Sequence, residues 1–360
     1  MSRFRRNVML VTVVVLAASG LGACNGGTSG GGGKKIALLL PESQTTRYES
    51  LDRPLFEAQV KKLCKSCKVV YKNANNDKSV QQSQMEATLS QQVDVVVLDP
   101  VDSSSAGSLV QKANQKKVPV IAYDRLIRGA KLDAYMSFDN VRVGRMQAQA
   151  LVDKLKKDGK KSGKIVMING DRADNNAQLF NQGAHQVLDS SGYTVVPGQD
   201  FWTEQWKSDK AQAFMEGQIS KLGADGFVGV YAANDATAGG AIAAMRAKGV
   251  KPLPPVTGQD AEKAGVQRII GGEQFMTVYK KIQPEADNAA KMAVALAQGK
   301  KPKTTTSIDN GAGKVPSMLL DPVAVTRSNV KKVIFGDNFY TPSQICTGEF
   351  AKSCDQLGIH

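Results

Sequence analysis

Short apolar stretches rich in Val and Ile alternate along the chain with longer segments in which apolar residues recur every three or four positions. Val141, Met146, Leu151 and Leu155 are one example of the longer spacing. The short stretches predict buried strands, and the longer segments predict helices that cover a sheet. This regular order predicts an α/β fold made of βαβ units on parallel sheets.

The predicted elements are too many for one sheet. Ten segments have the strand pattern, and 360 residues are too many for a single hydrophobic core. We therefore expect two lobes of ordinary size. The predicted strands are 36–40, 69–71, 93–98, 118–123, 134–138, 164–168, 194–196, 226–231, 255–257 and 276–279. The predicted helices include 57–63, 79–91, 141–157, 177–190, 236–248 and 284–298.

The N-terminus has the pattern of an export signal. Arg3, Arg5 and Arg6 precede an apolar run over residues 8–18. Eleven residues are too few to cross a bilayer core, which needs about 20. The run therefore predicts the core of a signal peptide over residues 1–23.

A lipid-attachment motif ends this segment. Leu21-Gly22-Ala23-Cys24 resembles the lipobox of bacterial lipoproteins, in which the cysteine matching Cys24 is lipidated and becomes the mature N-terminus. Residues 24–34 are rich in Gly and predict a flexible tether with no capacity to pack. We therefore expect an exported protein, lipid-anchored to the outer face of the bacterial cytoplasmic membrane.

Composition and charge narrow the function classes. Hydrophobic residues make up 42% and charged residues 22%, which is typical of a globular protein and excludes disorder for most of the chain. Lys and Arg number 47 against 33 acidic residues, a net charge of +14 that favours weak association with an anionic envelope. The positive residues are mostly scattered lysines without an Arg-rich block, so we expect no nucleic-acid binding.

Four cysteines remain once Cys24 carries lipid. An even number in an oxidising compartment favours two disulfides, and our preferred pairing is Cys64–Cys67 with Cys346–Cys354. Cys64-Lys65-Ser66-Cys67 could also be a redox motif or half of a zinc site. Redox motifs normally begin a helix, which lowers the thiol pKa, whereas this one follows a predicted helix and leads into a strand. Structural disulfides are therefore favoured, with zinc and redox roles as alternatives.

Polar side chains cluster after the carboxyl ends of the predicted strands, where open parallel sheets bind ligands. The set comprises Arg47-Tyr48, Asp99, Asp124-Arg125, Asp139-Asn140, Asp171, Asp174-Asn175-Asn176, Asn234-Asp235, Gln259-Asp260 and Lys280. Carboxylates, amides and guanidinium groups can meet the adjacent hydroxyls of a sugar, and Trp202 or Trp206 can cover its C–H face. The pattern predicts a sugar-binding cleft, although Asp174 and Asp235 are also placed to cap the helices that follow them.

Enzymatic motifs are largely missing. The sequence has no G-x-G-x-x-G after a strand, no phosphate-binding G-x-x-x-x-G-K-[ST] and no H-E-x-x-H. His185 falls within a predicted helix, where we expect a packing or surface role, so Ser-His-Asp chemistry lacks a base. Asp124, Asp174 and Asp260 could supply the carboxylate pair of a glycosidase, which remains an alternative.

Several longer segments resemble the periplasmic sugar-binding proteins of ABC importers, type I fold, and most closely their D-xylose-binding branch. They occur in order along the folded region: Ala122-Tyr123-Asp124-Arg125-Leu126-Ile127, Ser137-Phe138-Asp139-Asn140, Asp174-Asn175-Asn176-Ala177, Asn234-Asp235-Ala236-Thr237-Ala238-Gly239-Gly240, Gly258-Gln259-Asp260-Ala261, Met276-Thr277-Val278-Tyr279-Lys280 and Asn310-Gly311 with Val315-Pro316-Ser317.

The resemblance implies a set of sugar-contacting residues. Position by position, these are Arg47, Asp124, Arg125, Asp174, Asn176, Trp206, Asn234, Asp260 and Lys280. Tyr48 stands where the family usually has Trp, and it still offers a stacking face.

The resemblance also implies the domain organisation, two Rossmann-like lobes joined by three crossovers with the sugar in the cleft. On this basis residues 35–139 plus 281–307 form the N-terminal lobe, and residues 140–280 plus 308–340 form the C-terminal lobe. Residues 341–360 form a Cys-containing tail outside the family pattern.

The function implied is that of a monomeric solute-binding lipoprotein. It would capture a monosaccharide, D-xylose or a related aldose, and deliver it to the permease of an ABC importer, with no covalent chemistry, cofactor or metal. A sugar sensor that presents its closed form to a signalling receptor would use the same lobes and is the alternative. An extracellular glycosidase is the third class.

Overall fold

The first lobe is built on a seven-stranded sheet. The computed structural model describes residues 33–198 and 200–360. The strand order is β10-β11-β5-β4-β3-β1-β2, in which β10 and β11 are antiparallel and the other neighbours are parallel. The strands are β1 (Lys35–Leu40), β2 (Lys68–Asn73), β3 (Val95–Leu98), β4 (Val120–Tyr123), β5 (Ala134–Phe138), β10 (Thr306–Asp309) and β11 (Lys314–Leu320).

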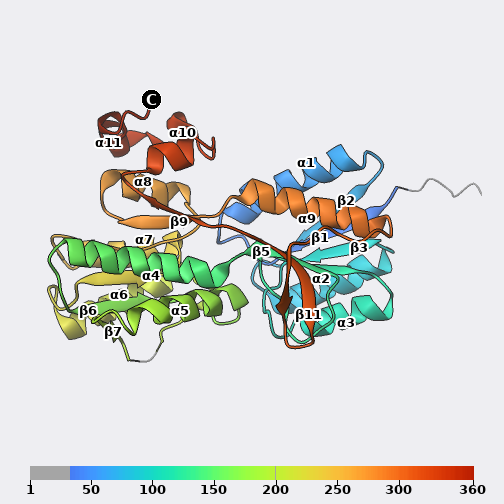
Figure 1. Cartoon of the computed structure of the whole chain (residues 1–360), viewed down its shortest axis with the longest axis horizontal. Helices are drawn as coiled ribbons and strands as arrows, with labels where there is room; N and C mark the ends of the chain where they lie inside the picture. Colours follow the sequence, from blue (N-terminus) through green and yellow to red (C-terminus); the bar gives the residue numbers. More distant parts are fainter. Residues whose placement is uncertain (1–32, 199) are drawn as a thin grey trace, which may run out of the picture. The chain divides into compact units, whose positions relative to one another are not determined.

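Two helices cover each face of this sheet (Figure 1). Successive side chains of a strand point to opposite faces, so an apolar run such as β1 serves two cores at once. Ile36 and Leu38 pack in the core shared with α1 and α9, and Ala37 and Leu39 pack in the core shared with α2 and α3. The helices are α1 (Arg53–Leu63), α2 (Lys78–Ser90), α3 (Gly107–Gln115) and α9 (Ile282–Ala297).

The second lobe repeats this construction on a smaller scale. Its parallel sheet has the order β7-β6-β8, and an antiparallel pair, β9 with β12, lies beside it. The strands are β6 (Lys164–Ile168), β7 (Thr194–Val196), β8 (Gly229–Ala232), β9 (Met276–Tyr279) and β12 (Val323–Thr326). The segment predicted as a strand at 255–257 contributes only a bridge from Val256 to Val230, next to prolines that lack a backbone donor.

Helices also cover both faces of the second sheet. Val143, Leu151 and Phe180 of α4 and α5 pack against Ile165 and Met167 on one face. The opposite face packs against α6 and α7. The helices are α4 (Asn140–Lys157), α5 (Asn175–Leu188), α6 (Ser208–Leu222), α7 (Asp235–Ala247) and α8 (Lys263–Gly271). The predicted α/β class with two parallel-sheet lobes is confirmed.

The chain passes between the lobes at three short crossovers. The first lies between β5 and α4 at Asp139, the second between β9 and α9 at residues 280–281, and the third between β11 and β12 at residues 321–322. The predicted boundary at residue 308 is wrong, because β11 pairs with β5 and carries β10 with it into the first sheet. Residues 308–320 therefore belong to the first lobe, and the chain returns to the second lobe at β12.

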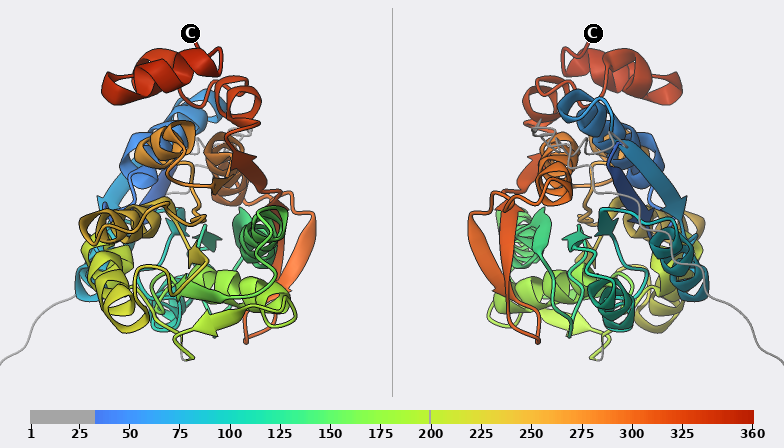
Figure 2. Two further views of the ribbon diagram at one scale, coloured as in Figure 1. Left: turned by 90° about the vertical axis from the view of Figure 1, so that its left-hand side faces the viewer. Right: turned by 90° about the vertical axis from the view of Figure 1, so that its right-hand side faces the viewer.

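The C-terminal segment packs onto the second lobe. Ile345, Cys354 and Ile359 join Val266 and Ile270 of α8 in one buried core. Figure 2 shows the terminal helices α10 (Pro342–Ile345) and α11 (Ala351–Gln356) at the top of both views, apart from the two sheets. This segment is thus an extension of the second lobe, secured by its own core.

Both disulfides of the preferred pairing are present in the structure. Cys64 is bonded to Cys67 after the end of α1, and Cys346 is bonded to Cys354 in the C-terminal segment. The expected signal peptide, the lipidated Cys24 and most of the tether at 24–34 lie outside the described residues. Within the described ranges, no helix is long and apolar enough to cross a membrane.

Two glycines allow the closest helix contact in the second lobe. A Cβ added at Gly144 of α4 would lie 1.9 Å from the Phe180 carbonyl oxygen, and one at Gly183 of α5 would lie 2.0 Å from the Val141 carbonyl oxygen. The two helices can therefore approach only if both positions lack a side chain. Their close packing fixes the start of α5, where Asn176 lies.

This contact predicts opposite effects for two Gly→Ala substitutions. Gly144→Ala should lower the free energy of unfolding by about 1–3 kcal/mol, because the new methyl group forces the helices apart. Gly217→Ala is the control, because a Cβ there meets nothing within 4 Å and Ala favours a helix by about 0.5–1 kcal/mol. Urea denaturation followed by circular dichroism measures both, and equal stability of the two variants would contradict the packing argument.

Candidate functional site

A cavity lies between the two lobes, walled by side chains from both. The space between its wall atoms is about 280 Å³, which includes part of the open solvent at its mouth, so it suits a small ligand. The walls are formed by Thr45, Arg47, Tyr48, Asp124, Arg125, Asp174, Asn176, Phe180, Trp206, Asn234, Gln259, Asp260 and Lys280.

The structure brings all ten residues of the predicted binding set to this cavity. They converge because the carboxyl ends of the strands in both lobes face it: Asp124 follows β4, Asn234 follows β8, and Lys280 follows β9. Thr45 and Phe180 were missed by the sequence analysis, and Gln259 was noted at a strand end but not carried into the set. Phe180 lies within α5, where an apolar residue gives no signal that distinguishes a cavity wall from the core.

Three wall residues have left-handed backbone conformations. Asp124 has φ 53°, Asp260 has φ 88° and Trp206 has φ 56°. Such conformations are unfavourable for residues with a side chain and persist only where the surrounding structure fixes them. The sharp turns they make aim each side chain into the cavity, and local sequence preferences give no sign of this.

Arg47 is held by carboxylates of the first lobe. Its guanidinium donates to Asp52 at 2.6 and 2.8 Å and to Glu285 of α9 at 2.6 Å. Asp124 lies 3.5 Å from its Nη1 atom. These partners share a buried position at the base of the cavity, so the guanidinium is fixed before any ligand arrives.

Arg125 links the two lobes. Its Nε atom lies 2.9 Å from Asp174 Oδ2 across the cavity, and Asp99 and Glu42 of its own lobe lie at 3.6 and 3.7 Å. Both oxygens of Asp99 are buried without a hydrogen-bond partner among the described residues. Burial raises the pKa of Asp99 well above its ordinary value, against the opposing effect of the Arg125 charge.

Lys280 makes a second link from its crossover. Its Nζ atom lies 3.2 Å from Asp260 in the second lobe and 3.8 Å from Asp124 in the first. Burial lowers the pKa of Lys280, but the charges of Asp124 and Asp260 outweigh this, so the net shift is upward and the ammonium is retained.

Tyr48 and Asn176 complete a network around Asp124. The Tyr48 hydroxyl donates to Asp124 Oδ2 at 3.0 Å, and Asn176 Nδ2 reaches from α5 to Asp124 Oδ1 at 3.3 Å. Two guanidinium groups also lie over the Tyr48 ring, with their carbons 5.3 Å (Arg47) and 5.7 Å (Arg125) from its centre. Tyr48 thus keeps both an aromatic face and a polar contact at this position.

Trp206 is both a cavity wall and a core residue. It is 6% exposed, packs edge-on to Phe180 and donates from Nε1 to Asp174 Oδ2 at 3.3 Å. A Cβ added at Gly170 would come within 1.9 Å of its ring. The indole can take this place only because residue 170 has no side chain. Trp202 lies elsewhere, partly buried with Arg172 near its ring.

Hydrogen bonds identify the residues that cap the N-termini of α5 and α7. Asn234 Oδ1 accepts from the backbone N–H of Thr237 at 2.9 Å and caps α7, and Asp174 Oδ1 accepts from Asn176 N–H at 2.8 Å and caps α5. Asp235, expected as a possible cap, is instead the first residue of α7. Its buried carboxylate accepts from Glu262 N–H, Gln274 and Thr277, so it braces the loop that carries Asp260.

Several buried polar atoms at the cavity have no hydrogen-bond partner within the described part of the chain. They are Arg47 Nη1, Arg125 Nε, Gln259 Oε1 and Asp260 Oδ1. Three of them lie within ion-pair distance of a charged group but without hydrogen-bond alignment: Arg125 Nε near Asp174, Arg47 Nη1 near Asp124, and Asp260 Oδ1 near Lys280. Buried polar groups are nearly always satisfied, so unpaired donors and acceptors lining one cavity indicate a polar ligand.

The acids of the site have opposite pKa shifts. Burial alone would raise the pKa of Asp124, but the charges of Lys280, Arg47 and Arg125 bring it down to about 2. Burial dominates at Asp174 and raises its pKa to about 6 despite the Arg125 charge. At neutral pH both are ionised hydrogen-bond acceptors.

Metal and histidine chemistry find no support around this cavity. In the residues that the structure describes, no group of His, Cys, Asp and Glu side chains is arranged to hold a metal ion. His185 lies on α5 and contacts Asp189 and Asp200 at 2.8 and 3.2 Å, outside the cavity walls, which agrees with the surface role expected for it.

Comparison with known proteins gives consistent matches. The family described as periplasmic binding protein domain matches residues 36–301. The D-xylose-binding periplasmic proteins of Haemophilus influenzae and Escherichia coli are each 38% identical, with alignments that cover 86% of this chain and 92% of each relative. A solved ABC transporter solute-binding protein from Clostridium phytofermentans, with bound β-D-glucose, has a TM-score of 0.81 and 32% identity, covering 87% of this chain and all of that one. The resemblance predicted from the sequence motifs is confirmed.

The two pKa shifts predict opposite pH dependences of stability in the ligand-free protein. Asp174 holds its proton more tightly when folded, so its contribution is present below pH 3.8 and is lost as pH rises through about 6. Asp124 is the reverse, with a contribution present above pH 3.8 that is lost as pH falls toward about 2.

Single variants isolate these contributions. Relative to the wild type, Asp174→Asn should gain stability as pH rises from 4 to 6, and Asp124→Asn should lose stability as pH rises from 2 to 4. Urea denaturation at closely spaced pH values gives both differences. A stability difference that does not vary with pH for either variant would contradict the assigned shift.

Proposed function

Because the chain belongs to the periplasmic binding protein family, we propose that it captures a monosaccharide, D-xylose or a related aldose, in the cavity between its lobes and delivers it to an ABC importer. The observation that carries this proposal is the convergence of ten polar and aromatic residues from both lobes on one small cavity with unpaired buried groups.

The unpaired atoms match the chemistry of a sugar. Arg47 Nη1 and Arg125 Nε are donors, and Gln259 Oε1 and Asp260 Oδ1 are acceptors. Each sugar hydroxyl donates one hydrogen bond and accepts others, so a polyhydroxylated ring can satisfy donors and acceptors on opposite walls. A purely anionic or cationic ligand would satisfy only one of these two kinds of atom.

Aromatic side chains supply the apolar part of the proposed site. Trp206 and Phe180 belong to the second lobe, and Tyr48 belongs to the first. A pyranose has C–H faces that pack on aromatic rings, while its hydroxyls point outward toward polar groups. This division suits a cavity with aromatic surface on both sides of the cleft.

The choice among aldoses rests on the relatives. Two of them are D-xylose-binding proteins, whereas the solved structure from Clostridium phytofermentans holds β-D-glucose. D-Xylose and D-glucose differ by one hydroxymethyl group. The D-xylose-binding relatives are more similar to this chain, at 38% identity against 32%, so we propose D-xylose first and other aldoses as weaker ligands.

Binding would couple to the arrangement of the lobes. A ligand that contacts Arg125 in the first lobe and Asp260 in the second stabilises the closed state, because it binds that state better than an open one. The closed form would then be the one that the permease receives. No step requires a covalent change, a cofactor or a metal.

The site is tested by calorimetry with residues 33–360 against D-xylose, L-arabinose, D-ribose, D-glucose and D-galactose. We expect one sugar per chain, with D-xylose bound most tightly. Asp260→Asn should weaken that binding by about ten- to a hundredfold, because a charged acceptor is lost from a buried hydroxyl, worth about 1.5–3 kcal/mol.

Asp158→Asn is the matched control. Asp158 also pairs with a lysine, Lys154, but outside the cavity walls and the crossovers, so its variant should bind sugar as the wild type does. A wild-type protein that binds none of the five aldoses would overturn the proposed function. Equal losses in the two variants would overturn the role of Asp260.

The second part of the proposal is the location. The lipobox ending in Cys24 and the Gly-rich residues after it support export and attachment to the outer face of the cytoplasmic membrane by lipid.

Cys24→Ala tests this attachment. The variant should move from the membrane fraction to the soluble fraction of cells while binding sugar unchanged, because the substitution lies outside the lobes. Fractionation at high salt, with the wild type as control, measures it. A variant that stays with the membranes after its signal peptide is removed would exclude the lipid anchor.

A further inference from the structure

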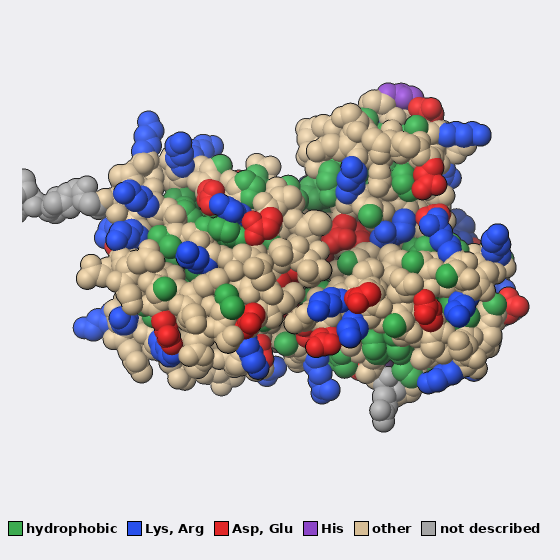
Figure 3. All heavy atoms as spheres, turned by 180° about the vertical axis from the view of Figure 1, so that it is seen from behind, with side chains coloured by type: hydrophobic (Ala, Val, Ile, Leu, Met, Phe, Trp, Pro, Cys, Tyr) green, Lys and Arg blue, Asp and Glu red, His purple; other side chains and the backbone are tan. Residues whose placement is uncertain are grey.

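One end of the first lobe has an unusual concentration of lysines. The N-terminal ends of β1, β2 and β4 lie there with the C-terminal ends of α1, α3 and α9, because each helix runs back against the strands. We define this end, the lysine edge, as residues 34–35, 61–68, 116–117 and 300–303. It contains eleven lysines and no acidic residue. Figure 3 shows Lys and Arg side chains gathered over this end of the lobe, at the left.

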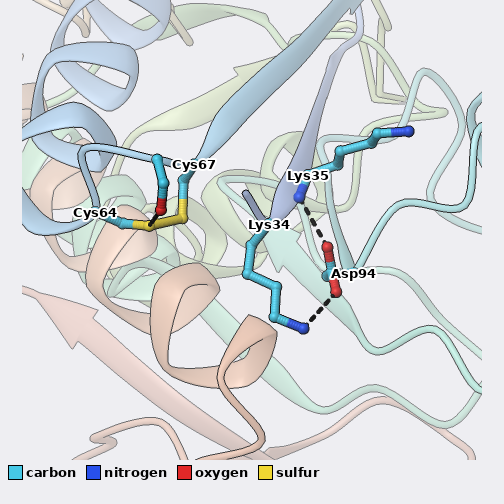
Figure 4. The surroundings of a disulfide bond; sticks show 6 residues. Lys34, Lys35, Cys64, Cys67 and Asp94 are labelled. Atoms are coloured by element: carbon cyan, nitrogen blue, oxygen red, sulfur yellow. Dashed lines mark hydrogen bonds and ion pairs between the residues drawn. A yellow bond between two sulfur atoms is a disulfide. The ribbon is translucent and has the colours of Figure 1, made fainter. Parts of the chain in front are cut away.

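The Cys64–Cys67 loop is the centre of the lysine edge. Figure 4 shows this disulfide beside Lys34 and Lys35, where the chain enters β1. Backbone hydrogen bonds tie the two segments together, since Lys68 N–H donates to Lys34 O at 2.8 Å. The short disulfide loop therefore holds Lys65 on a fixed surface next to the chain entry, with Lys61, Lys62 and Lys68 on either side of it in the sequence.

The nearby acids are already engaged. Asp94 accepts from Lys34 Nζ and from the Lys35 N–H, both at 2.8 Å, and Asp133 accepts from the Val120 N–H at 2.9 Å. Of the lysines at this edge, Lys34 is the one to which the described part of the chain offers an ion-pair partner. Lys35 Nζ donates to Gln91 O at 2.9 Å, and the other lysines of the edge are exposed, as is Leu63 beside them at 42%.

The second lobe differs at its equivalent end. Lysines also lie there in the last turn of α4, at 156–157, and just after it, at 160–161, but acidic residues are interleaved with the positive ones. Asp158 pairs with Lys154, and Glu273 pairs with Arg246. Lysines near helix C-termini are common because they complement the helix dipole, but that explanation does not account for eleven lysines at the first edge with Asp94 and Asp133 as the acids beside them.

We propose that the lysine edge is a docking surface for an anionic lipid bilayer, a second contact that orients the anchored protein. This inference rests on the proposed lipid anchor for its geometry. Residues 24–33 can span at most about 35 Å in any conformation, so the chain entry stays within that distance of an anchored Cys24. Lysines near an anionic surface attract it strongly within a Debye length of about 8 Å, and each contributes several-fold in affinity.

The position of the edge limits what this contact can do. It lies entirely on the first lobe, at the end of the sheet opposite the cavity, so bilayer binding does not bridge the lobes. A contact that has the same affinity for the open and the closed state cannot shift the equilibrium between them. Sugar affinity should therefore be the same in solution and on vesicles.

The test uses residues 33–360 without the anchor, because they form a compact unit that contains all five buried cores. The protein is sedimented with vesicles of phosphatidylcholine alone or mixed with phosphatidylglycerol. We expect binding to the anionic vesicles only, and its loss in 0.5 M salt.

Two charge-matched variants locate the contact. Lys61→Gln, Lys62→Gln, Lys65→Gln and Lys301→Gln combined should weaken vesicle binding at least about tenfold. Lys156→Gln, Lys157→Gln, Lys160→Gln and Lys161→Gln combined remove the same charge from the second lobe and should weaken it less than about twofold. Equal losses of vesicle binding in the two variants would show attraction by net charge alone and would overturn the proposal. A wild-type protein that does not bind anionic vesicles, or that binds soluble polyphosphate in preference to them, would also overturn it.

The sugar-binding assay separates this proposal from the function. All variants should retain the wild-type affinity for sugar, with or without vesicles. If the wild-type protein bound no sugar, the proposed function would be overturned and the vesicle result would still stand. If vesicles changed the sugar affinity, that would contradict a contact confined to one lobe.

Discussion

Ion pairs buried between the two lobes determine how the lobes are held against each other. Arg125 faces Asp174 across the cavity at 2.9 Å, and Lys280 lies between Asp260 and Asp124 at 3.2 and 3.8 Å. Removing charges from water is costly, and attraction between partners repays that cost only when each is well placed. The surrounding network of Tyr48 and Asn176 supplies this placement by fixing the Asp124 carboxylate from both lobes.

The same network leaves some of its groups incompletely satisfied. Arg47 donates hydrogen bonds to Asp52 and Glu285, yet among the described residues its Nη1 atom has only a 3.5 Å ion pair with Asp124, and Asp260 Oδ1 has only its ion pair with Lys280. A cavity lined by such atoms has more to gain from a hydroxyl-rich ligand than from an apolar one. The charges therefore serve two purposes, because they hold the lobes together and leave hydrogen-bonding capacity for a ligand.

Much of this arrangement could be predicted from the sequence because strand ends are visible in it. Apolar runs followed by Asp, Asn, Arg or Lys marked the cavity edge of both sheets, and the family motifs selected ten residues that the structure brings together. The failures have physical reasons. β11 joins the first sheet through long-range pairing with β5, which no local pattern reveals, so residues 308–320 were assigned to the wrong lobe. The left-handed turns at Asp124 and Asp260 depend on their surroundings, and Phe180 looks like any other core residue of a helix.

The position of Lys280 has a mechanical consequence. The residue is part of one of the three short crossovers, and its ammonium also forms part of the cavity wall. Any rotation of one lobe against the other must be absorbed by backbone torsions in those few residues. If the cavity binds a ligand as proposed, a contact with Lys280 acts directly on a crossover, so binding could change the angle between the lobes without any relay through the body of either lobe.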